Sequence, residues 1–358
     1  MKRTLLAVAL LLGANAAAAQ ETAGIKAYSK VDFVAGTEIL FFDDFGDDAI
    51  GDFPDGWDTN ASAEIVTVEG HDGRWLMFTR AGVFLPILAE PLPDYFSLEF
   101  DLLTNTPFPG GTQFATSFVE LANLNQPAVW HGANNRYTYS VHPSGVSASE
   151  RRQESVGEAA VGTQAEPFAG KNGGVAHVSA WRTKERMRVY VNDEKVWDIP
   201  RAMVPTGNYN AILFYVHYVD DETQYYISNL RLAVGAPDTR NRLITEGKWT
   251  TNGILFDTNS DRIRGESYGT LKEIAGVLNE DKSVRVQIIG HTDSDGDETI
   301  NLDLSKRRAA AVREALAAEF GIDAARMETD GRGESEPAAP NATAAGKASN
   351  RRVEFVKA

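Results

Sequence analysis

The feature that most limits the fold of this chain is a change in the spacing of its apolar residues near residue 235. Before that point, apolar and polar side chains alternate in short runs such as YFSLEFDLL (95–103) and ERMRVYV (185–191). Successive side chains of a strand point to opposite faces, so a period of two is typical of half-buried strands. Beyond residue 250, runs with helical spacing separate the strand-like runs. We therefore expect two domains of different fold class.

Residues 37–235 carry many short strand patterns, turns rich in Gly and Pro, and hardly any helical spacing. Asn192 and Asp193 are expected to form a turn between two strands. Further strands are expected at AILFYVHYV (211–219) and QYYISNLRLAV (224–234), the first of them buried on both faces. Many strands without helices predict an all-β antiparallel sandwich or barrel.

After a predicted linker at 236–250, residues 251–358 alternate between strand and helix patterns, which predicts a compact α+β domain. We expect strands at 253–256, 283–291 and 351–358, and helices at 266–280 and 302–320.

The first twenty residues are predicted to be a signal peptide that is removed on export. Lys2 and Arg3 form a charged head, Leu5–Leu12 an apolar core, and Ala17–Ala19 a small-residue cleavage site. The apolar run is too short to span a bilayer. Residues 21–36 are expected to be a loosely ordered lead-in. The chain has no cysteine, so the exported protein relies on its core rather than on disulfides.

The chain carries a formal net charge of −15 at pH 7. A surface with this acidic excess repels nucleic acid and anionic lipid, so no nucleic-acid partner is expected. Its six histidines show no metal-ligand spacing, and no serine lies in a nucleophile-elbow pattern. We expect no cofactor, no resident metal and no enzymatic activity.

The segment HTDSDGDETINLDLSKRRAAAV (291–312) is the most charged motif of the C-terminal half. Alternating aspartates follow Thr292 as in a calcium loop. However, Gly296 interrupts the carboxylates, and Leu304 stands where a closing glutamate is required. Calcium at this loop is therefore disfavoured.

The helix that follows places an arginine among apolar residues. Leu304, Arg308 and Val312 share one helical face, since positions four apart stack on each other. A guanidinium cannot lose its proton, so burial of Arg308 requires an anion. Two interpretations remain open: an internal salt bridge, most simply to Asp293 at the end of the preceding strand, or a site for an anionic ligand.

The strings GHTDSDG and TAAGKASNRRV, with the residues around them, resemble the OmpA-like C-terminal domain of outer-membrane protein A, Pal and the motor stator proteins. The resemblance spans about Gly253–Val356. It implies an α+β fold that binds peptidoglycan non-covalently through the diaminopimelate of the stem peptide. The far end of diaminopimelate is zwitterionic, so its site needs one anion and one cation.

The resemblance also assigns roles by position. Asp293 would hold the ligand's ammonium, and Arg308 would fork onto its carboxylate. Each charge-assisted contact would contribute ~1.5–3 kcal/mol. The supporting positions are Asn259, Thr292, Asn301 and Arg351. For Asn259, Thr292 and Asn301, a purely structural role as a cap or turn former stays open.

Three positions depart from the family pattern. Ile300 and Arg332 replace aromatic residues, and Lys347 replaces an arginine. None of these three positions contacts the ligand's charged groups in the family pattern. The departures therefore affect the surface shape of the site and its ligand preference.

Within the N-terminal half, EILFFDDFGDDAIGDFPDGWDTN (38–60), RMRVYVNDEKVWDIPRA (186–202) and YNAILFYVHYVDDETQYYISNLRLA (209–233) resemble the concanavalin A-like, laminin-G-like jelly-roll domains. The resemblance implies a sandwich with a face for a glycan or an envelope protein. The resemblance also leaves open a structural calcium ion bound near Asp43 and Asp44. Fold alone does not determine function.

Two rival interpretations concern this half. Sandwich glucanases carry the pattern E.D..E on one strand; Glu99 and Asp101 fit its start, but Thr104 replaces the second glutamate. Two acids on a strand most often lie on a solvated face, so a wall-tethered glycan-processing enzyme is the less favoured alternative. A transmembrane barrel is also less favoured, because the runs are short, irregular and separated by acidic turns.

Taken together, the sequence predicts a non-enzymatic protein of the periplasm or outer membrane of a Gram-negative bacterium. Its C-terminal domain would bind peptidoglycan and tether the β-sandwich to the wall.

Overall fold

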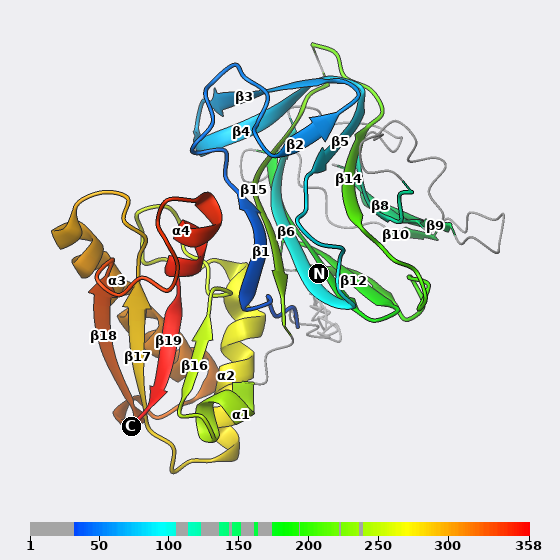
Figure 1. Ribbon diagram of the computed structural model, residues 1–358. Coiled ribbons are helices and arrows are strands. Elements are labelled where there is room, and N and C mark those ends of the chain that lie inside the picture. Colours follow the sequence, from blue (N-terminus) through cyan, green and yellow to red (C-terminus); the bar gives the residue numbers. More distant parts are fainter. Residues whose placement is uncertain are drawn as a thin grey trace, which may run out of the picture.

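The computed structural model describes residues 32–104, 114–122, 136–142, 145–151, 161–163, 174–192, 194–221, 223–235 and 239–358. The predicted signal peptide and residues 21–31 of the predicted lead-in lie outside these ranges. The described residues form a β-rich lobe up to residue 235 and a smaller mixed lobe from residue 239 (Figure 1). Among them, no helix is long and apolar enough to cross a membrane.

Two antiparallel sheets make up the described part of the N-terminal lobe. The first sheet has the order β13 (Glu194–Ile199), β12 (Arg186–Val191), β11 (Val175–Thr183), β6 (Tyr95–Thr104), β15 (Tyr225–Val234), β4 (His71–Arg80) and β3 (Ser62–Val68), and β1 (Glu38–Asp43) also pairs with β15. The second sheet has the order β10 (Val161–Thr163), β9 (Gly145–Arg151), β8 (Arg136–His142), β7 (Phe114–Val119), β14 (Ala211–Val216), β5 (Gly82–Pro86) and β2 (Trp57–Thr59). The strands predicted at 95–103, 185–191, 211–219 and 224–234 are confirmed as β6, β12, β14 and β15, although β14 ends at Val216.

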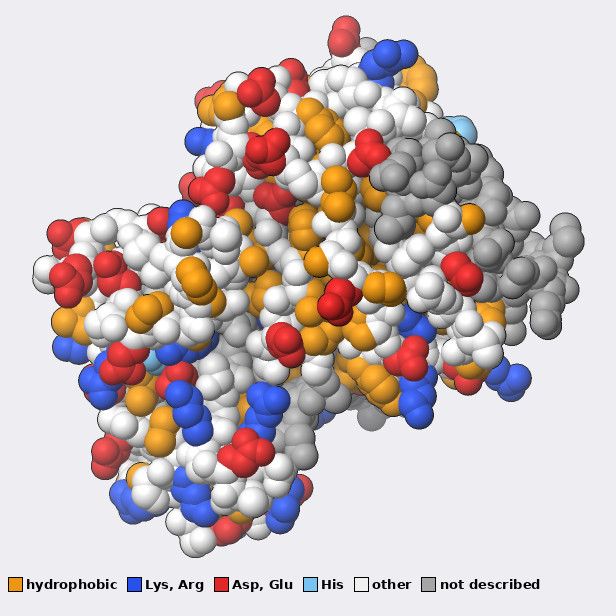
Figure 2. All heavy atoms as spheres, viewed as in Figure 1, with side chains coloured by type: hydrophobic (Ala, Val, Ile, Leu, Met, Phe, Trp, Pro, Cys, Tyr) orange, Lys and Arg blue, Asp and Glu red, His pale blue; other side chains and the backbone are white. Residues whose placement is uncertain are grey.

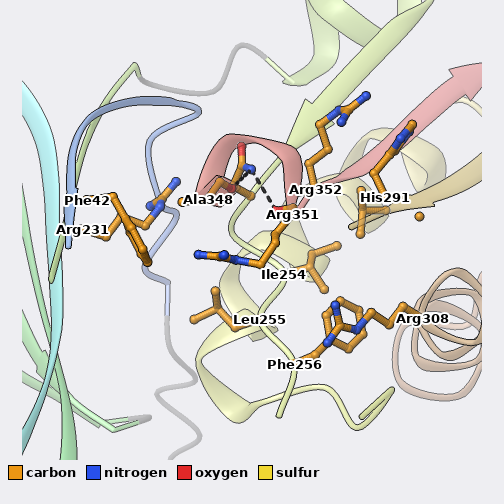
Figure 3. A pocket seen from close by; sticks show the side chains of 13 residues that line it. Phe42, Arg231, Ile254, Leu255, Phe256, His291, Arg308, Ala348, Arg351 and Arg352 are labelled. Atoms are coloured by element: carbon orange, nitrogen blue, oxygen red, sulfur yellow. Dashed lines mark hydrogen bonds between the residues drawn. The ribbon is translucent and has the colours of Figure 1, made fainter. Parts of the chain in front are cut away.

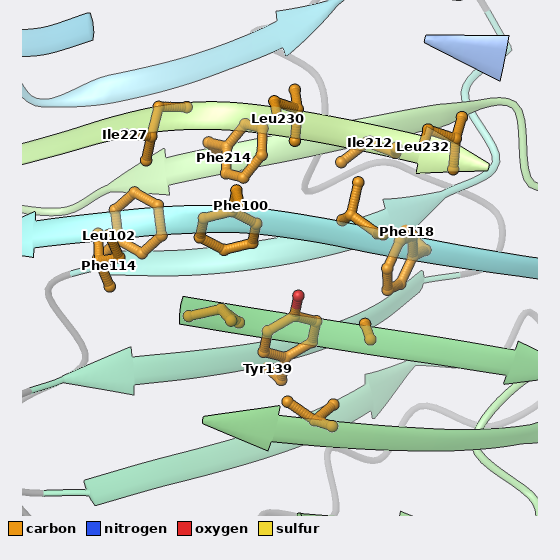
Figure 4. Close-up of a cluster of buried hydrophobic side chains, with 14 of the residues drawn as sticks. Phe100, Leu102, Phe114, Phe118, Tyr139, Ile212, Phe214, Ile227, Leu230 and Leu232 are labelled. Carbon is orange, nitrogen blue, oxygen red and sulfur yellow. The ribbon is translucent and has the colours of Figure 1, made fainter. Parts of the chain in front are cut away.

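A core of apolar side chains lies between the two sheets (Figure 4). Phe100 of β6 meets Phe114 and Phe214 of the second sheet. The Phe100 and Phe214 rings cross at 83° with their centroids 5.3 Å apart, the edge-to-face geometry that aromatic pairs prefer. Two sheets that each bury one apolar face against the other form a sandwich.

The C-terminal lobe is built on a four-stranded sheet. Its strand order is β16 (Lys248–Thr251), β19 (Val353–Lys357), β17 (Val286–His291) and β18 (Met327–Gly333), and only β17 and β18 are parallel. Its helices are α1 (Thr239–Ile244), α2 (Tyr268–Glu280), α3 (Glu298–Phe320) and α4 (Ala344–Asn350), with 3₁₀ turns at Gly265–Ser267 and Ala324–Arg326. Helix α4 lies against β1 of the sandwich (Figure 1).

Helix α3 starts four residues earlier than predicted. The Asp297 carboxylate accepts hydrogen bonds from the N–H groups of Thr299 and Ile300, and this N-cap starts the helix at Glu298. At the other end, Gly321 adopts a left-handed conformation with φ 68°, which glycine allows without strain.

The structure corrects both the predicted linker and the predicted first strand of this lobe. Residues 236–250 include α1 and most of β16, whereas 253–256 form only an isolated bridge at Phe256. Trp249 explains the difference, because it is fully buried beside Phe355 of β19 with the ring centroids 5.4 Å apart. A four-residue strand anchored by one aromatic side chain is too short for its alternation to be recognised.

A fragment that starts at residue 250 is expected to be less stable than one that starts at residue 239. The shorter fragment loses Leu243 and Trp249, both fully buried in the core of the lobe. Removing one buried Trp side chain typically costs ~3–5 kcal/mol. Urea unfolding followed by circular dichroism measures the difference. Equal midpoints and slopes for the two fragments would show that α1 and β16 do not belong to this domain.

The end of the predicted lead-in is packed between the lobes rather than loose. Phe33 and Ala35 are buried, and Phe33 packs on Tyr190 with ring centroids 5.4 Å apart. The backbone of Phe33 also lies so close to Gly269 of α2 that a Cβ at that glycine would overlap the Phe33 carbonyl oxygen. Residues 32–36 therefore join the sandwich to the C-terminal lobe.

The acidic excess of the sequence is visible on the molecular surface. On the face shown in Figure 2, Asp and Glu side chains lie over both lobes, and Lys and Arg side chains are interspersed with them over the C-terminal lobe.

Candidate ligand site between the lobes

A cavity of about 580 Å³ lies between the two lobes. This volume falls within the range of ~300–1,000 Å³ that is common for small-molecule sites. The C-terminal lobe contributes the loop after β17, the start of α3 and the segment before α2, and the sandwich contributes β1, β4, β6, β11 and β15. All six predicted site residues line this cavity: Asn259, Thr292, Asp293, Asn301, Arg308 and Arg351.

Asp293 is a fixed negative charge at the cavity wall. It follows the end of β17, and only 7% of the residue is exposed. Its carboxylate accepts a hydrogen bond from Arg351 Nη1 at 2.6 Å and one from the N–H of Asp295 at 3.1 Å. Both contacts hold the carboxylate in one orientation.

Asn301 fixes the loop that carries Asp293. Its side-chain nitrogen donates to the carbonyl oxygens of Asp293 and Asp295, at 3.3 and 3.0 Å, and to Glu334 Oε2 at 2.6 Å. These hydrogen bonds stabilise the loop itself. They agree with a purely structural role of Asn301 as a turn former.

Two other supporting residues differ in what they offer. The Thr292 hydroxyl is buried and has no hydrogen-bond partner among the described residues. It is therefore a free donor and acceptor beside Asp293. Asn259 adopts a left-handed conformation with φ 53°, which fits a turn former, and its side chain also lines the cavity.

Arg308 is a half-buried cation that has no acidic partner among the residues with described positions. Its Nε donates to the carbonyl oxygen of Ser260 at 2.9 Å, and the guanidinium lies over the Phe256 ring, 4.9 Å from the centroid. Among the described residues, no carboxylate oxygen lies within 4.0 Å of it. Burial lowers the pKa of Arg308 to about 10 against the attraction of Asp293, so the side chain stays charged at neutral pH. The anticipated salt bridge between Arg308 and Asp293 is not formed; Arg351 takes that place.

Arg351 connects the two lobes. Besides its bond to Asp293, its guanidinium lies over the Phe42 ring, 5.1 Å from the centroid, and 4.0 Å from Asp44 Oδ2. A smaller cavity of about 140 Å³ adjoins these side chains (Figure 3), in which Arg351 extends toward Phe42 and Arg231 of the sandwich. Arg351 therefore has two acidic neighbours, Asp293 on the C-terminal lobe and Asp44 on the sandwich.

On the sandwich wall, the structure shows a charge cluster that the sequence did not predict. Glu99 and Asp101, expected on a solvated face, are only 3% and 5% exposed. His177 of β11 places Nδ1 2.7 Å from Asp101 Oδ1 and Nε2 3.7 Å from Glu99 Oε2. Arg231 Nη1 donates to Glu99 at 2.6 Å. The expectation was wrong because the C-terminal lobe covers this face of the sheet.

The charges of this cluster stabilise one another. Burial alone would lower the pKa of the His177 imidazole, but its hydrogen bond to Asp101 and its ion pair with Glu99 raise the pKa to about 10. Conversely, burial would raise the pKa of Asp101 and Glu99, but the neighbouring cations hold both pKa values below their usual range. Arg264 of the C-terminal lobe lies 3.4 Å from Asp101, so the cluster also ties the lobes together.

Residues 255–351 match the OmpA family. Outer membrane porin F of Pseudomonas aeruginosa is 43% identical over 101 residues, which cover 28% of this chain and 29% of porin F. The probable lipoprotein YiaD of Escherichia coli is 44% identical over 104 residues, which cover 29% of this chain and 47% of YiaD. This chain thus spans less than half the length of either curated relative.

Solved structures are also similar to part of this chain. The peptidoglycan-associated lipoprotein from Burkholderia pseudomallei is 32% identical and matches 29% of this chain and 88% of that chain, with a TM-score of 0.28.

Proposed function

We propose that this chain, whose residues 255–351 form an OmpA family domain, tethers its sandwich to the cell wall by binding peptidoglycan non-covalently. The ligand would be the diaminopimelate of the stem peptide. One observation carries the proposal: a single cavity is lined by a fixed anion, Asp293, and by Arg308, a cation with no acidic partner in the part of the chain that the structure describes. The zwitterionic end of diaminopimelate has the complementary pair of charges.

The contacts of Arg308 suit it to a carboxylate. Phe256 and the carbonyl oxygen of Ser260 orient the guanidinium, and neither cancels its charge. A planar guanidinium held in this way can donate two parallel hydrogen bonds to one carboxylate.

The ammonium of the ligand would go to Asp293. Arg351 occupies this carboxylate in the free protein, so the ammonium would share or displace that bond. A displaced Arg351 has Asp44 and the Phe42 ring beside it, which lowers the cost of the exchange. The Thr292 hydroxyl, which has no partner within the described ranges, would offer one more hydrogen bond.

We further propose that the sandwich is of the concanavalin A-like jelly-roll type and presents a glycan or an envelope protein at the wall. The outer-membrane and lipoprotein names of the relatives support a location in the periplasm or outer membrane. Affinity at one site is expected to be weak, and the many copies in a wall polymer would raise the overall avidity.

The rival function is a glycan-processing site at Glu99 and Asp101. A general acid in glycoside hydrolysis needs a raised pKa. Ion pairs with His177 and Arg231 hold both carboxylates as anions instead, which supports a non-enzymatic role. Hydrolysis of any member of a polysaccharide panel that is lost in Glu99→Gln would support the enzyme.

Purified sacculi are expected to pull the chain covering residues 21–358 into the pellet on centrifugation. An excess of free meso-diaminopimelate should return it to the supernatant, because it competes for Asp293 and Arg308. Sacculi with lysine in place of diaminopimelate serve as the control, since lysine lacks the second carboxylate. A chain that stays in the supernatant with both kinds of sacculi would exclude the proposed function.

A further inference from the structure

Among the described residues, the cavity between the lobes holds one more unpaired cation than the zwitterionic end of diaminopimelate requires. Arg231, Arg264 and Arg351 each pair with a carboxylate. Among the described residues, the two arginines of the cavity with no carboxylate oxygen within 4.0 Å are Arg308 and Arg74. Arg308 belongs to the C-terminal lobe and Arg74 to β4 of the sandwich. Two unpaired cations in one cavity indicate a ligand with two carboxylates.

Arg74 is held in position but not neutralised. The side chain is half-buried, and its Nη1 donates to the carbonyl oxygen of Phe45 at 3.4 Å and to that of Asp48. These neutral acceptors orient the guanidinium and leave its full charge. Asp72 also lines the cavity but forms no ion pair with Arg74 in the described part of the chain. Burial of an unpaired charge costs free energy, which an anionic ligand would offset.

The lobes that carry the two cations are tied together around the cavity. Arg264 of the C-terminal lobe lies 3.4 Å from Asp101, and Lys347 lies 3.8 Å from Asp47 of the sandwich. With Phe33 packed between the lobes, these contacts fix Arg74 relative to Arg308. Such a preorganised pair loses little entropy when a ligand bridges it.

A stem peptide carries a further carboxylate on the residue that precedes its diaminopimelate. One of the two amino groups of diaminopimelate forms the peptide bond to the γ-carboxyl group of a D-glutamate. The α-carboxylate of that glutamate is therefore free. In some walls this group is amidated to isoglutamine, which has nearly the same shape but no charge. An arginine facing this position would distinguish the two forms.

We infer, resting on the proposed function, that Arg74 binds the α-carboxylate of this glutamate. The sandwich then forms the second half of the wall-binding site and is not only the domain that is tethered to the wall. The chain selects stem peptides whose glutamate is not amidated.

Titration calorimetry of residues 21–358 with two synthetic tripeptides tests this inference. One is L-alanyl-γ-D-glutamyl-meso-diaminopimelate, and the other carries D-isoglutamine in place of the glutamate. The wild-type chain should bind the acidic tripeptide at least about tenfold more tightly, since it forms one more charge-assisted contact. Arg74→Ala should bind both tripeptides with similar affinity.

Arg80→Ala is the matched control. Arg80 lies on the same strand, is exposed and does not line the cavity, so its removal should leave the tenfold preference intact. A purely structural role of Arg74 would weaken binding of both tripeptides equally and preserve the preference. If Arg74→Ala does not fold, Arg74→Gln replaces it, because glutamine can still donate to the carbonyls of Phe45 and Asp48.

Equal affinity of the wild type for the two tripeptides would overturn the inference and leave the proposed function standing. If Arg74→Ala still prefers the acidic tripeptide, a group other than Arg74 binds the α-carboxylate of its glutamate. If the wild type binds neither tripeptide, both the inference and the proposed function fail.

Discussion

Replacing Arg308 with alanine is expected to weaken binding of diaminopimelate-containing sacculi roughly 10- to 150-fold, because a charge-assisted contact contributes ~1.5–3 kcal/mol. The fold should survive, since Arg308 forms no ion pair among the described residues and loses only its bond to Ser260 and its contact with Phe256. Co-sedimentation isotherms measure the affinity, and thermal unfolding by circular dichroism measures the stability.

The neighbouring residue provides the control for charge. Arg307 is more exposed and pairs with Asp303 and Asp261 outside the cavity, so Arg307→Ala removes the same charge and should leave binding unchanged. Arg308→Lys keeps the positive charge, but lysine cannot donate two parallel hydrogen bonds to one carboxylate. An affinity between those of the wild type and Arg308→Ala is therefore expected. Equal losses for Arg307→Ala and Arg308→Ala would show that net charge, and not the site, drives binding.

Replacing Asp293 with asparagine is expected to reduce binding by a similar factor. The substitution keeps an acceptor for the N–H of Asp295 but removes the negative charge that would hold the ligand's ammonium. It also breaks the ion pair with Arg351, whose remaining acidic neighbour is Asp44 at 4.0 Å. The affinity for free meso-diaminopimelate, measured by titration calorimetry, is the direct readout.

Asp303→Asn is the matched control, because Asp303 is an exposed carboxylate of the same helix-loop region outside the cavity. It should bind like the wild type. An Asp293→Asn variant that loses its fold but keeps binding in the folded fraction would support a structural salt bridge instead of a ligand site.

The six residues proposed for the C-terminal site could be singled out from the sequence because they are close in the chain or carried by specific motifs. The acidic loop after β17 and the helix with Arg308 adjoin each other, and all six predicted residues line one cavity. The pairing inside the cavity could not be predicted. Arg351, 58 positions from Asp293, takes the carboxylate for which Arg308 was the nearer candidate in sequence. Only the tertiary fold decides between them.

The interface between the lobes could not be predicted from the sequence patterns. Alternation in β6 places Glu99 and Asp101 on one face correctly, but it cannot show that another lobe covers that face. His177 lies 76 positions from Asp101, and no local spacing joins them. Similarly, Arg74 stands in a strand whose burial is irregular, and its place in the cavity depends on how the lobes meet.

A crystal structure of residues 21–358 with the glutamate-containing tripeptide bound is the most direct test of the central claim. In the proposed complex, the ammonium of the diaminopimelate end lies within hydrogen-bond distance of Asp293, and its carboxylate accepts two parallel hydrogen bonds from Arg308. Diaminopimelate found outside the cavity, or bound inside it with neither side chain in contact, would contradict the account.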